Sequence, residues 1–280
     1  MGEYEKAENI LHPRLTQLMV DQIIDQYACY DLLGTLAGRN GNFEKAIEYH
    51  LNSVELQQQV TPTDYKQLAL SYNNLGKSYG MNGQIDLALS SLFKSNNIKS
   101  QLLDDDNHLL FAATYENIGN CYFAQNKLDE AQQYFQCAFD IRQRNNIPEN
   151  SPEYIEYYVS VANIFGLKKQ YLEATDYHKK TIEIAHQVLP LDHPWLAVCY
   201  NNLGKDYADQ KRYKLARQNY QRALSIYEQT MPDGHPEKQR TQDNLNEINM
   251  ELRTHAGILL LITTISMLSI LFFILKCSNQ

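Results

Sequence analysis

The chain has 280 residues, of which 44% are hydrophobic and 21% are charged, and its net charge is −8. This composition is that of an ordinary folded protein and excludes a mostly disordered one. An acidic chain also lacks the basic face that phosphate contacts require, so we expect no nucleic-acid partner.

The chain opens with residues 1–26, which we expect to form a helical extension, because Leu11 to Tyr27 fits a helix that extends or caps the structure after it. The first residues, MGEYEKAENI, are acidic and lack the apolar core of a signal peptide. The five Cys residues show no C-x-x-C spacing, so neither a disulfide framework nor a zinc site is expected.

Residues 27–234 contain five copies of one pattern, spaced 42 or 43 residues apart. Each copy is centred on a small residue, namely Gly34, Gly76, Gly119, Ala162 and Gly204. Four residues before it stands a tyrosine: Tyr30, Tyr72, Tyr115, Tyr158 and Tyr200. Twelve residues after it stands an alanine: Ala46, Ala88, Ala131, Ala174 and Ala216. This agreement makes internal repetition the strongest signal in the sequence.

The spacing within each copy predicts two helices joined by a turn. Apolar residues at positions −4, −1, 0 and +3 around the small residue form one helical stripe, and the small residue lets a second helix approach closely. A short polar turn follows, and a second apolar stripe then begins at Phe43, Ile85, Leu128, Tyr171 and Tyr213. A single hairpin cannot bury both stripes, so we expect the hairpins to stack and share a continuous core.

The pattern resembles tetratricopeptide repeats. The phrases HPWLAVCYNNLGKDYADQKRYKLARQNYQRALSIYEQ and LLFAATYENIGNCYFAQNKLDEAQQYFQCAFDIRQ are similar to the kinesin light chain and nephrocystin subgroup. The resemblance implies an all-α helix–turn–helix solenoid that serves as a non-enzymatic scaffold for a protein or extended peptide. The heptad-rich segment that joins kinesin light chains to the motor has no counterpart in residues 1–26, so we expect no motor subunit.

The resemblance also implies a peptide-binding groove along the first helix of each repeat. On those helices, the positions three before and one after the small residue lie one turn apart. The predicted groove residues are Asn73, Lys77, Glu116, Asn120, Asn163, Asn201 and Lys205. Amides can both donate to and accept from a peptide backbone, and the lysines favour carboxylates. The alternative is that these are solvated helix positions without a ligand.

The C-terminal quarter of the chain predicts two further segments. Residues 235–255 carry Leu245, Ile248 and Leu252 at helical spacing and predict a capping helix. Residues 257–275, GILLLITTISMLSILFFIL, contain neither a charge nor a proline and span about 28 Å as a helix, which matches a bilayer core. We therefore predict one transmembrane helix, with the bilayer as a partner. A buried solenoid helix is the alternative, but it would show a polar face.

Residues 276–280 form a short polar tail, in which Cys277 is either acylated or an unmodified thiol. The predicted topology is tail-anchored, with the repeats in the cytosol. Few flanking cations favour the endoplasmic reticulum over the mitochondrial outer membrane.

Nothing in the sequence predicts catalysis. GxxxxGK[ST], HExxH, GxSxG and GxGxxG are all absent, so we expect no enzyme, cofactor, metal or small-molecule substrate. His50 and His178 hold equivalent repeat positions, which favours a structural role. The predicted function is a scaffold at a cytosolic membrane face. The alternatives are a regulatory subunit or pathogen effector acting on a membrane-associated host protein, and a kinesin-light-chain-like cargo adaptor whose tail docks on a partner.

Overall fold

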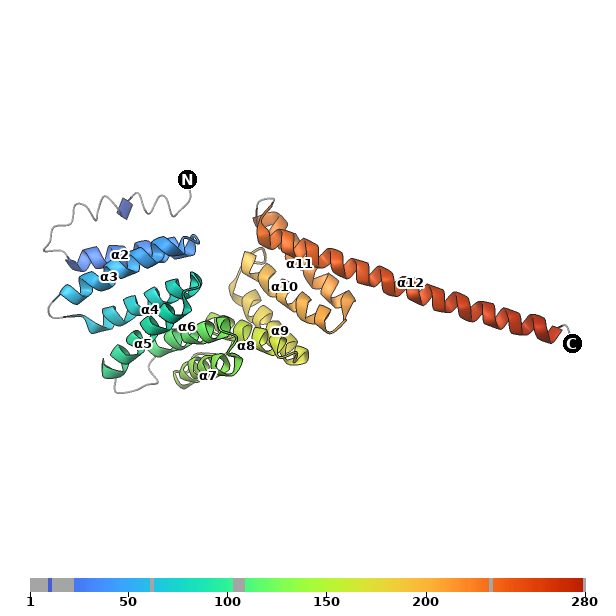
Figure 1. The fold of residues 1–280 in the computed structure, drawn as a ribbon, viewed down its shortest axis with the longest axis horizontal. Coiled ribbons are helices and arrows are strands. Elements are labelled where there is room, and N and C mark those ends of the chain that lie inside the picture. The colour runs from blue at the N-terminus through green and yellow to red at the C-terminus, as the bar shows by residue number, and fades with distance from the viewer. Residues whose placement is uncertain (1–9, 12–22, 61–62, 103–108, 232–233, 279–280) are drawn as a thin grey trace. The chain divides into compact units, whose positions relative to one another are not determined.

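The computed structural model describes residues 10–11, 23–60, 63–102, 109–231 and 234–278, and the side chains of 10–11 and of 26–268 within these ranges. In this part of the chain the regular elements are helices, without strands (Figure 1). The elements are α2 Ile23–Arg39, α3 Phe43–Gln59, α4 Tyr65–Met81, α5 Ile85–Leu102, α6 Leu110–Ala124, α7 Leu128–Arg144, η2 Pro152–Tyr154, α8 Ile155–Leu167, α9 Tyr171–Val188, α10 Pro194–Asp209, α11 Tyr213–Thr230 and α12 Pro236–Ser278.

The chain divides into two compact units, residues 1–149 and 150–280. The first unit contains three helical pairs, α2/α3, α4/α5 and α6/α7, and the second contains α8/α9, α10/α11 and α12. Within each pair the two helices pack together, and within each unit the second helix of one pair packs on the first helix that follows it. The predicted all-α repeat fold is therefore confirmed. Most of the predicted extension over residues 1–26 lies outside the described residues.

The turn inside each pair is built in the same way five times. The second helices begin at Phe43, Ile85, Leu128, Tyr171 and Tyr213, as the pattern predicts. One residue of each turn has a left-handed backbone: Gly41, Gly83, Asn126, Lys169 and Lys211. Such a conformation suits glycine and asparagine but costs a lysine about 1 kcal/mol, so packing of the paired helices must enforce it in the last two turns.

The small residue at the centre of each first helix gives the second helix its close approach. A Cβ added at Gly76 would lie 2.6 Å from Cγ of Leu92, and one added at Gly119 would lie 2.8 Å from the ring of Phe135. Gly34 and Gly204 face His50 and Tyr220 at equally short distances. The alanines of the second helices complete the contact, since Ala46, Ala88, Ala131, Ala174 and Ala216 are all fully buried.

The core of the second unit continues into α12. Leu245 and Ile248 are buried in the same apolar cluster as Tyr220 and Tyr227 of α11, and Leu252 packs against its edge. The first turns of α12 thus take the place of another first helix and cover the apolar face of α11. These three residues are the ones that the helical spacing singled out in the sequence for a capping helix, and they make the contacts of α12 with this cluster.

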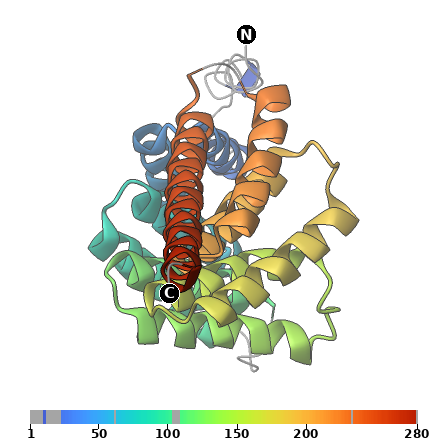
Figure 2. The same ribbon diagram turned by 90° about the vertical axis from the view of Figure 1, so that its right-hand side faces the viewer.

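The capping segment and the apolar segment form one helix. α12 runs for 43 residues through Gly257 without a break and extends far beyond the start of α11 (Figure 1), and Figure 2 looks along it nearly end-on. Among the described residues it is the one helix long and apolar enough to cross a membrane, and its apolar window is not buried against the protein. The composition of the sequence separates a polar capping segment from an apolar segment, but nothing at 255–257 interrupts the hydrogen bonds of the helix.

The close approach of the paired helices predicts that a Gly→Ala substitution has different effects on stability at Gly119 and at Gly80. Gly119→Ala forces a methyl group against the fully buried Phe135 and should lower the free energy of unfolding by about 1–3 kcal/mol. Gly80→Ala meets its nearest atom at 3.6 Å, an ordinary contact, and should be neutral or raise stability by up to about 1 kcal/mol. Urea unfolding followed by circular dichroism measures both. Equal effects would show that the helices do not meet at Gly119.

Candidate partner-binding surface

The predicted groove residues fall into two groups in the structure. Those one residue after the small residue reach the surface: Lys77, Asn120 and Lys205 are exposed and Asn163 is half-buried. Those three residues before it are interior: Asn73 is 9% exposed, and Glu116 and Asn201 are 5% exposed. The two rows therefore do not share one surface, and the interior row has a different role.

In the first unit the interior row joins neighbouring first helices. Asp31 of α2 accepts a hydrogen bond from the Ser71 hydroxyl of α4 at 2.7 Å, and Gln57 of α3 donates to Ser71 at the same distance. One repeat later, Asn73 of α4 accepts from the Thr114 hydroxyl of α6 at 3.0 Å. Each bond crosses from one helical pair to the next, so these polar side chains hold adjacent repeats in register.

Lys99 completes the second of these links. Its ammonium donates to the Leu110 carbonyl at 2.8 Å and to the Thr114 hydroxyl, which in turn donates to Asn73. The side chain is buried, and this burial lowers the pKa of Lys99 to about 8. Neutral oxygens accept hydrogen bonds from the ammonium here in place of a carboxylate, so they offset only part of the cost of its desolvation.

The third repeat uses a buried ion pair at the equivalent positions. Arg142 of α7 donates from both terminal nitrogens to the Glu116 carboxylate of α6, at 2.6 and 2.7 Å. Both residues are less than 10% exposed. Bidentate geometry satisfies both charges, but each charge depends on the other, because a single buried charge loses its hydration without compensation.

The last two repeats vary the same positions. In the fifth, Asn201 of α10 accepts from the Thr241 hydroxyl of α12 at 3.1 Å, so α12 is joined to α10 as one repeat is joined to the next. In the fourth, the corresponding residues are Val159, Ala185 and Cys199, which carry no hydrogen-bonding amide, hydroxyl or charge. The chain itself therefore contains polar, ionic and apolar versions of one contact.

The surface-facing stripe of the first helices shares one row with the predicted groove, and its other row lies one residue away from the predicted row. On α4, α6, α8 and α10 it contains the positions two before and one after the small residue, which are exposed or half-buried; the same positions of α2 are the exposed Leu32 and Thr35, which carry no amide and are left out. In the first unit its members are Asn74, Lys77, Asn117 and Asn120, and in the second they are Ser160, Asn163, Asn202 and Lys205. Asn117 also donates to Asn73 at 3.2 Å, which orients its side chain at the edge of the stripe. We call these eight residues the first-helix stripe.

The positions of this stripe that the sequence prediction did not name are Asn74, Asn117, Ser160 and Asn202. The motif YNNLG offers two adjacent asparagines, and identity alone does not tell which one faces solvent. The available signal was the small polar residue five before the glycine, Ser71 or Thr114. Such a residue fits a buried contact with the next repeat and indicates which face is covered.

Two buried histidines each lie beside one aspartate. Nδ1 of His50 lies 3.3 Å from Asp31, and Nδ1 of His178 lies 2.6 Å from Asp206. Within the described ranges no three His, Cys, Asp or Glu side chains gather as a metal site would require. Burial also raises the pKa of the Cys121 thiol to about 11, which disfavours the nucleophilic thiolate.

Two models of one protein family match this chain. A family model described as tetratricopeptide repeat matches residues 26–94 and 153–229, together more than half of the chain. A second model of the same description matches residues 111–146. No curated protein matches the chain.

Solved structures share the architecture at low sequence identity. BtubC (BKLC) from P. vanneervenii is 18% identical, with a TM-score of 0.64 over 83% of this chain and 94% of that one. A putative kinesin light chain from Podosopora anserina, with nearly identical TPR-like repeats, is 19% identical, with a TM-score of 0.56 over 72% of this chain and 94% of that one. At this identity the likeness shows the fold alone.

Because the two charges depend on each other, we expect the effects of substituting Glu116 and Arg142 on the free energy of unfolding to be strongly non-additive. Glu116→Val leaves Arg142 buried without its carboxylate and should lower the free energy of unfolding by about 3–5 kcal/mol. Adding Arg142→Met, which makes the contact apolar as in the fourth repeat, should recover a large part of that loss. Thermal and urea unfolding of the two variants and of Arg142→Met alone give the coupling energy. Additive losses would contradict a mutually dependent pair.

Proposed function

Since the chain belongs to the tetratricopeptide repeat family, we propose that it is a non-enzymatic scaffold that binds a protein or extended peptide through the first-helix stripe. The stripe carries the observation that supports this most strongly. In each unit it repeats amide side chains and includes one exposed lysine, Lys77 or Lys205. Regularly spaced amides suit a peptide backbone, whose donors and acceptors also repeat regularly.

The charge of the first-helix stripe indicates which kind of side chain its partner carries. Asn74, Asn117, Asn120, Asn163 and Asn202 are neutral, so the two lysines dominate its interaction with a ligand. An extended segment with acidic side chains is the ligand that this arrangement favours. Exposed charges act mainly through long-range attraction, so binding should weaken as salt rises.

The adjacent asparagines of the motif provide a matched test. Asn74→Ala with Asn202→Ala should reduce partner capture severalfold, at about 0.5–1.5 kcal/mol per lost hydrogen bond, without changing the melting temperature. Asn73→Ala with Asn201→Ala removes the acceptor of the buried Thr114 hydroxyl and leaves Thr241 with the Glu237 carbonyl alone, so it should lower the melting temperature instead. Proximity labelling from the full-length protein, quantified by mass spectrometry, measures capture. The same labelled proteins at the same yield from both double variants and wild type would move the binding surface elsewhere.

We further propose that α12 anchors this scaffold in a membrane, with the repeats at the cytosolic face. Five consecutive side chains, Ile258 to Ile262, are each 51–67% exposed. Because successive residues on a helix point about 100° apart, these five cover every direction around α12. A helix docked on one partner surface would show an apolar face and a polar face, so an apolar solvent on all sides fits better.

The polar side chains of the apolar segment support the same proposal. The hydroxyls of Thr263 and Thr264 donate to the carbonyls of Leu260 and Leu261 at 2.8 Å, and Ser266 donates to Ile262. Their hydrogen bonds are thus made within the helix, as a hydrocarbon environment requires. The endoplasmic reticulum stays the predicted membrane, because the segment is strongly apolar and has few flanking cations.

Two arginine substitutions on α12 test the anchor. Leu268→Arg places a charge inside the segment and should weaken insertion by about 2.5–3.5 kcal/mol. Met250→Arg, at a position just as exposed but outside the segment, should leave insertion unchanged. The measurement is the fraction of full-length protein that stays with membranes after alkaline carbonate extraction. Wild-type protein released by carbonate would refute the anchor.

A further inference from the structure

A shallow hollow of about 340 Å³ lies where α12 leaves the repeats. It is lined by Lys211, Arg212, Tyr213, Lys214 and Leu215 of the α10–α11 turn and the start of α11, and by Leu252 and His255 of α12. The rings of Tyr213 and His255 are 5.4 Å apart between centroids. The hollow therefore has an aromatic floor, and cationic side chains at its rim.

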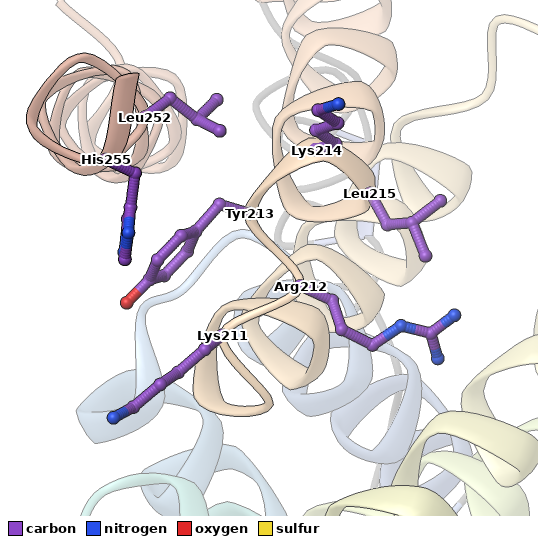
Figure 3. A pocket seen from close by; sticks show the side chains of 7 residues that line it. All are labelled: Lys211, Arg212, Tyr213, Lys214, Leu215, Leu252 and His255. Carbon is purple, nitrogen blue, oxygen red and sulfur yellow. The ribbon is translucent and has the colours of Figure 1, made fainter. Parts of the chain in front are cut away.

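The side chains of the hollow are divided between two sides (Figure 3). The Tyr213 ring points toward α12 and His255, and Lys211 extends beneath the same ring. Arg212 points the other way, and its guanidinium lies 5.1 Å from the ring centroid of Tyr207. Lys211, Tyr213 and His255 are thus the groups available to one small anionic ligand, whereas Lys214 points away from them.

The hollow belongs to a basic edge of the second unit. Gln210, in the α10–α11 turn, donates to the Tyr171 carbonyl at 3.0 Å, so the α8–α9 turn with Lys168 and Lys169 lies beside it. Residues 166–171, 208–217 and 250–256 together carry seven Lys or Arg and only two acids, Asp209 and Glu251. In a chain whose net charge is −8, this edge has the opposite sign.

This edge is the part of the repeats nearest to the apolar segment. His255 precedes Gly257 by two residues, a rise of about 3 Å along the helix. Tyr213 beside it therefore lies at the depth where tyrosines are enriched in membrane proteins, the level of the lipid headgroups. Lys211, Lys214 and Arg253 occupy the same level, since they flank these two rings.

Resting on the membrane anchor proposed above, we infer that the hollow between α11 and α12 binds the headgroup of an anionic phospholipid in the cytosolic leaflet. The Lys211 ammonium pairs with the phosphate, and Lys214 adds to the attraction. The Tyr213 hydroxyl and the His255 imidazole donate hydrogen bonds to the phosphate oxygens. A zwitterionic headgroup carries no net charge and gains less at this edge.

The test measures lipid selectivity around the full-length protein in vesicles. Spin-labelled phosphatidylserine and phosphatidylcholine report, by electron spin resonance, how strongly each associates with the inserted protein. Wild type should prefer phosphatidylserine severalfold, since one lysine near the surface is worth about a fivefold change in affinity. Lys211→Glu with Lys214→Glu should abolish the preference. Lys179→Glu with Arg222→Glu, the same charge change at exposed positions of α9 and α11, should retain it.

The outcomes separate this inference from the anchor. Protein that resists carbonate extraction but shows equal association of the two lipids, or a preference that survives charge reversal at Lys211 and Lys214, overturns the headgroup site and leaves the anchor standing. Release by carbonate removes the anchor and the inference with it. Excess inorganic phosphate at constant ionic strength should not reduce the preference, and a loss there would assign the hollow to a free anion instead. Unchanged circular dichroism checks that both double variants fold.

Discussion

The contact between a small residue on each first helix and the side chain opposite on the second helix is the constraint on which the repeats depend. At Gly119 and Gly204 an aromatic ring fills the space that a Cβ would take, and at Gly76 a leucine does so. This distance fixes how closely the two helices of a pair approach. The left-handed turn residues, including Lys169 and Lys211, then follow from the short path between helices at that separation.

The residue types that face the neighbouring repeat vary more than those inside a helical pair. The position three before the small residue is filled by an aspartate, an asparagine, a glutamate, a valine and another asparagine in turn. Asp31, Asn73 and Asn201 each accept a hydrogen bond from a hydroxyl beyond their own pair, whereas Glu116 is satisfied by Arg142 of its own pair. Buried polar groups need specific partners, so each interface accepts its own neighbour better than another repeat.

The continuity of α12 joins the proposed anchor directly to the second unit. Leu245 and Ile248 lie in the core of the second unit, and the same helix runs on into the apolar segment. Thr241 is bonded to Asn201, so side-chain packing and a buried hydrogen bond both hold the start of α12 in place. With no flexible linker between them, the position of the helix in a bilayer would also set the orientation of the second unit and of its basic edge.

The sequence alone was sufficient for the features that repeat within one helical pair. The first residues of the second helices, the turns and the buried alanines all follow from the period and from the stripe on each helix, because these are local consequences of 3.6 residues per turn. The choice between Asn73 and Asn74, or Asn201 and Asn202, needed the folded protein. These neighbours are chemically identical, and which one is covered depends on how the next pair packs against the helix. That packing is set by residues about 40 positions away, such as Thr114 and Thr241, so no pattern within a single repeat contains it.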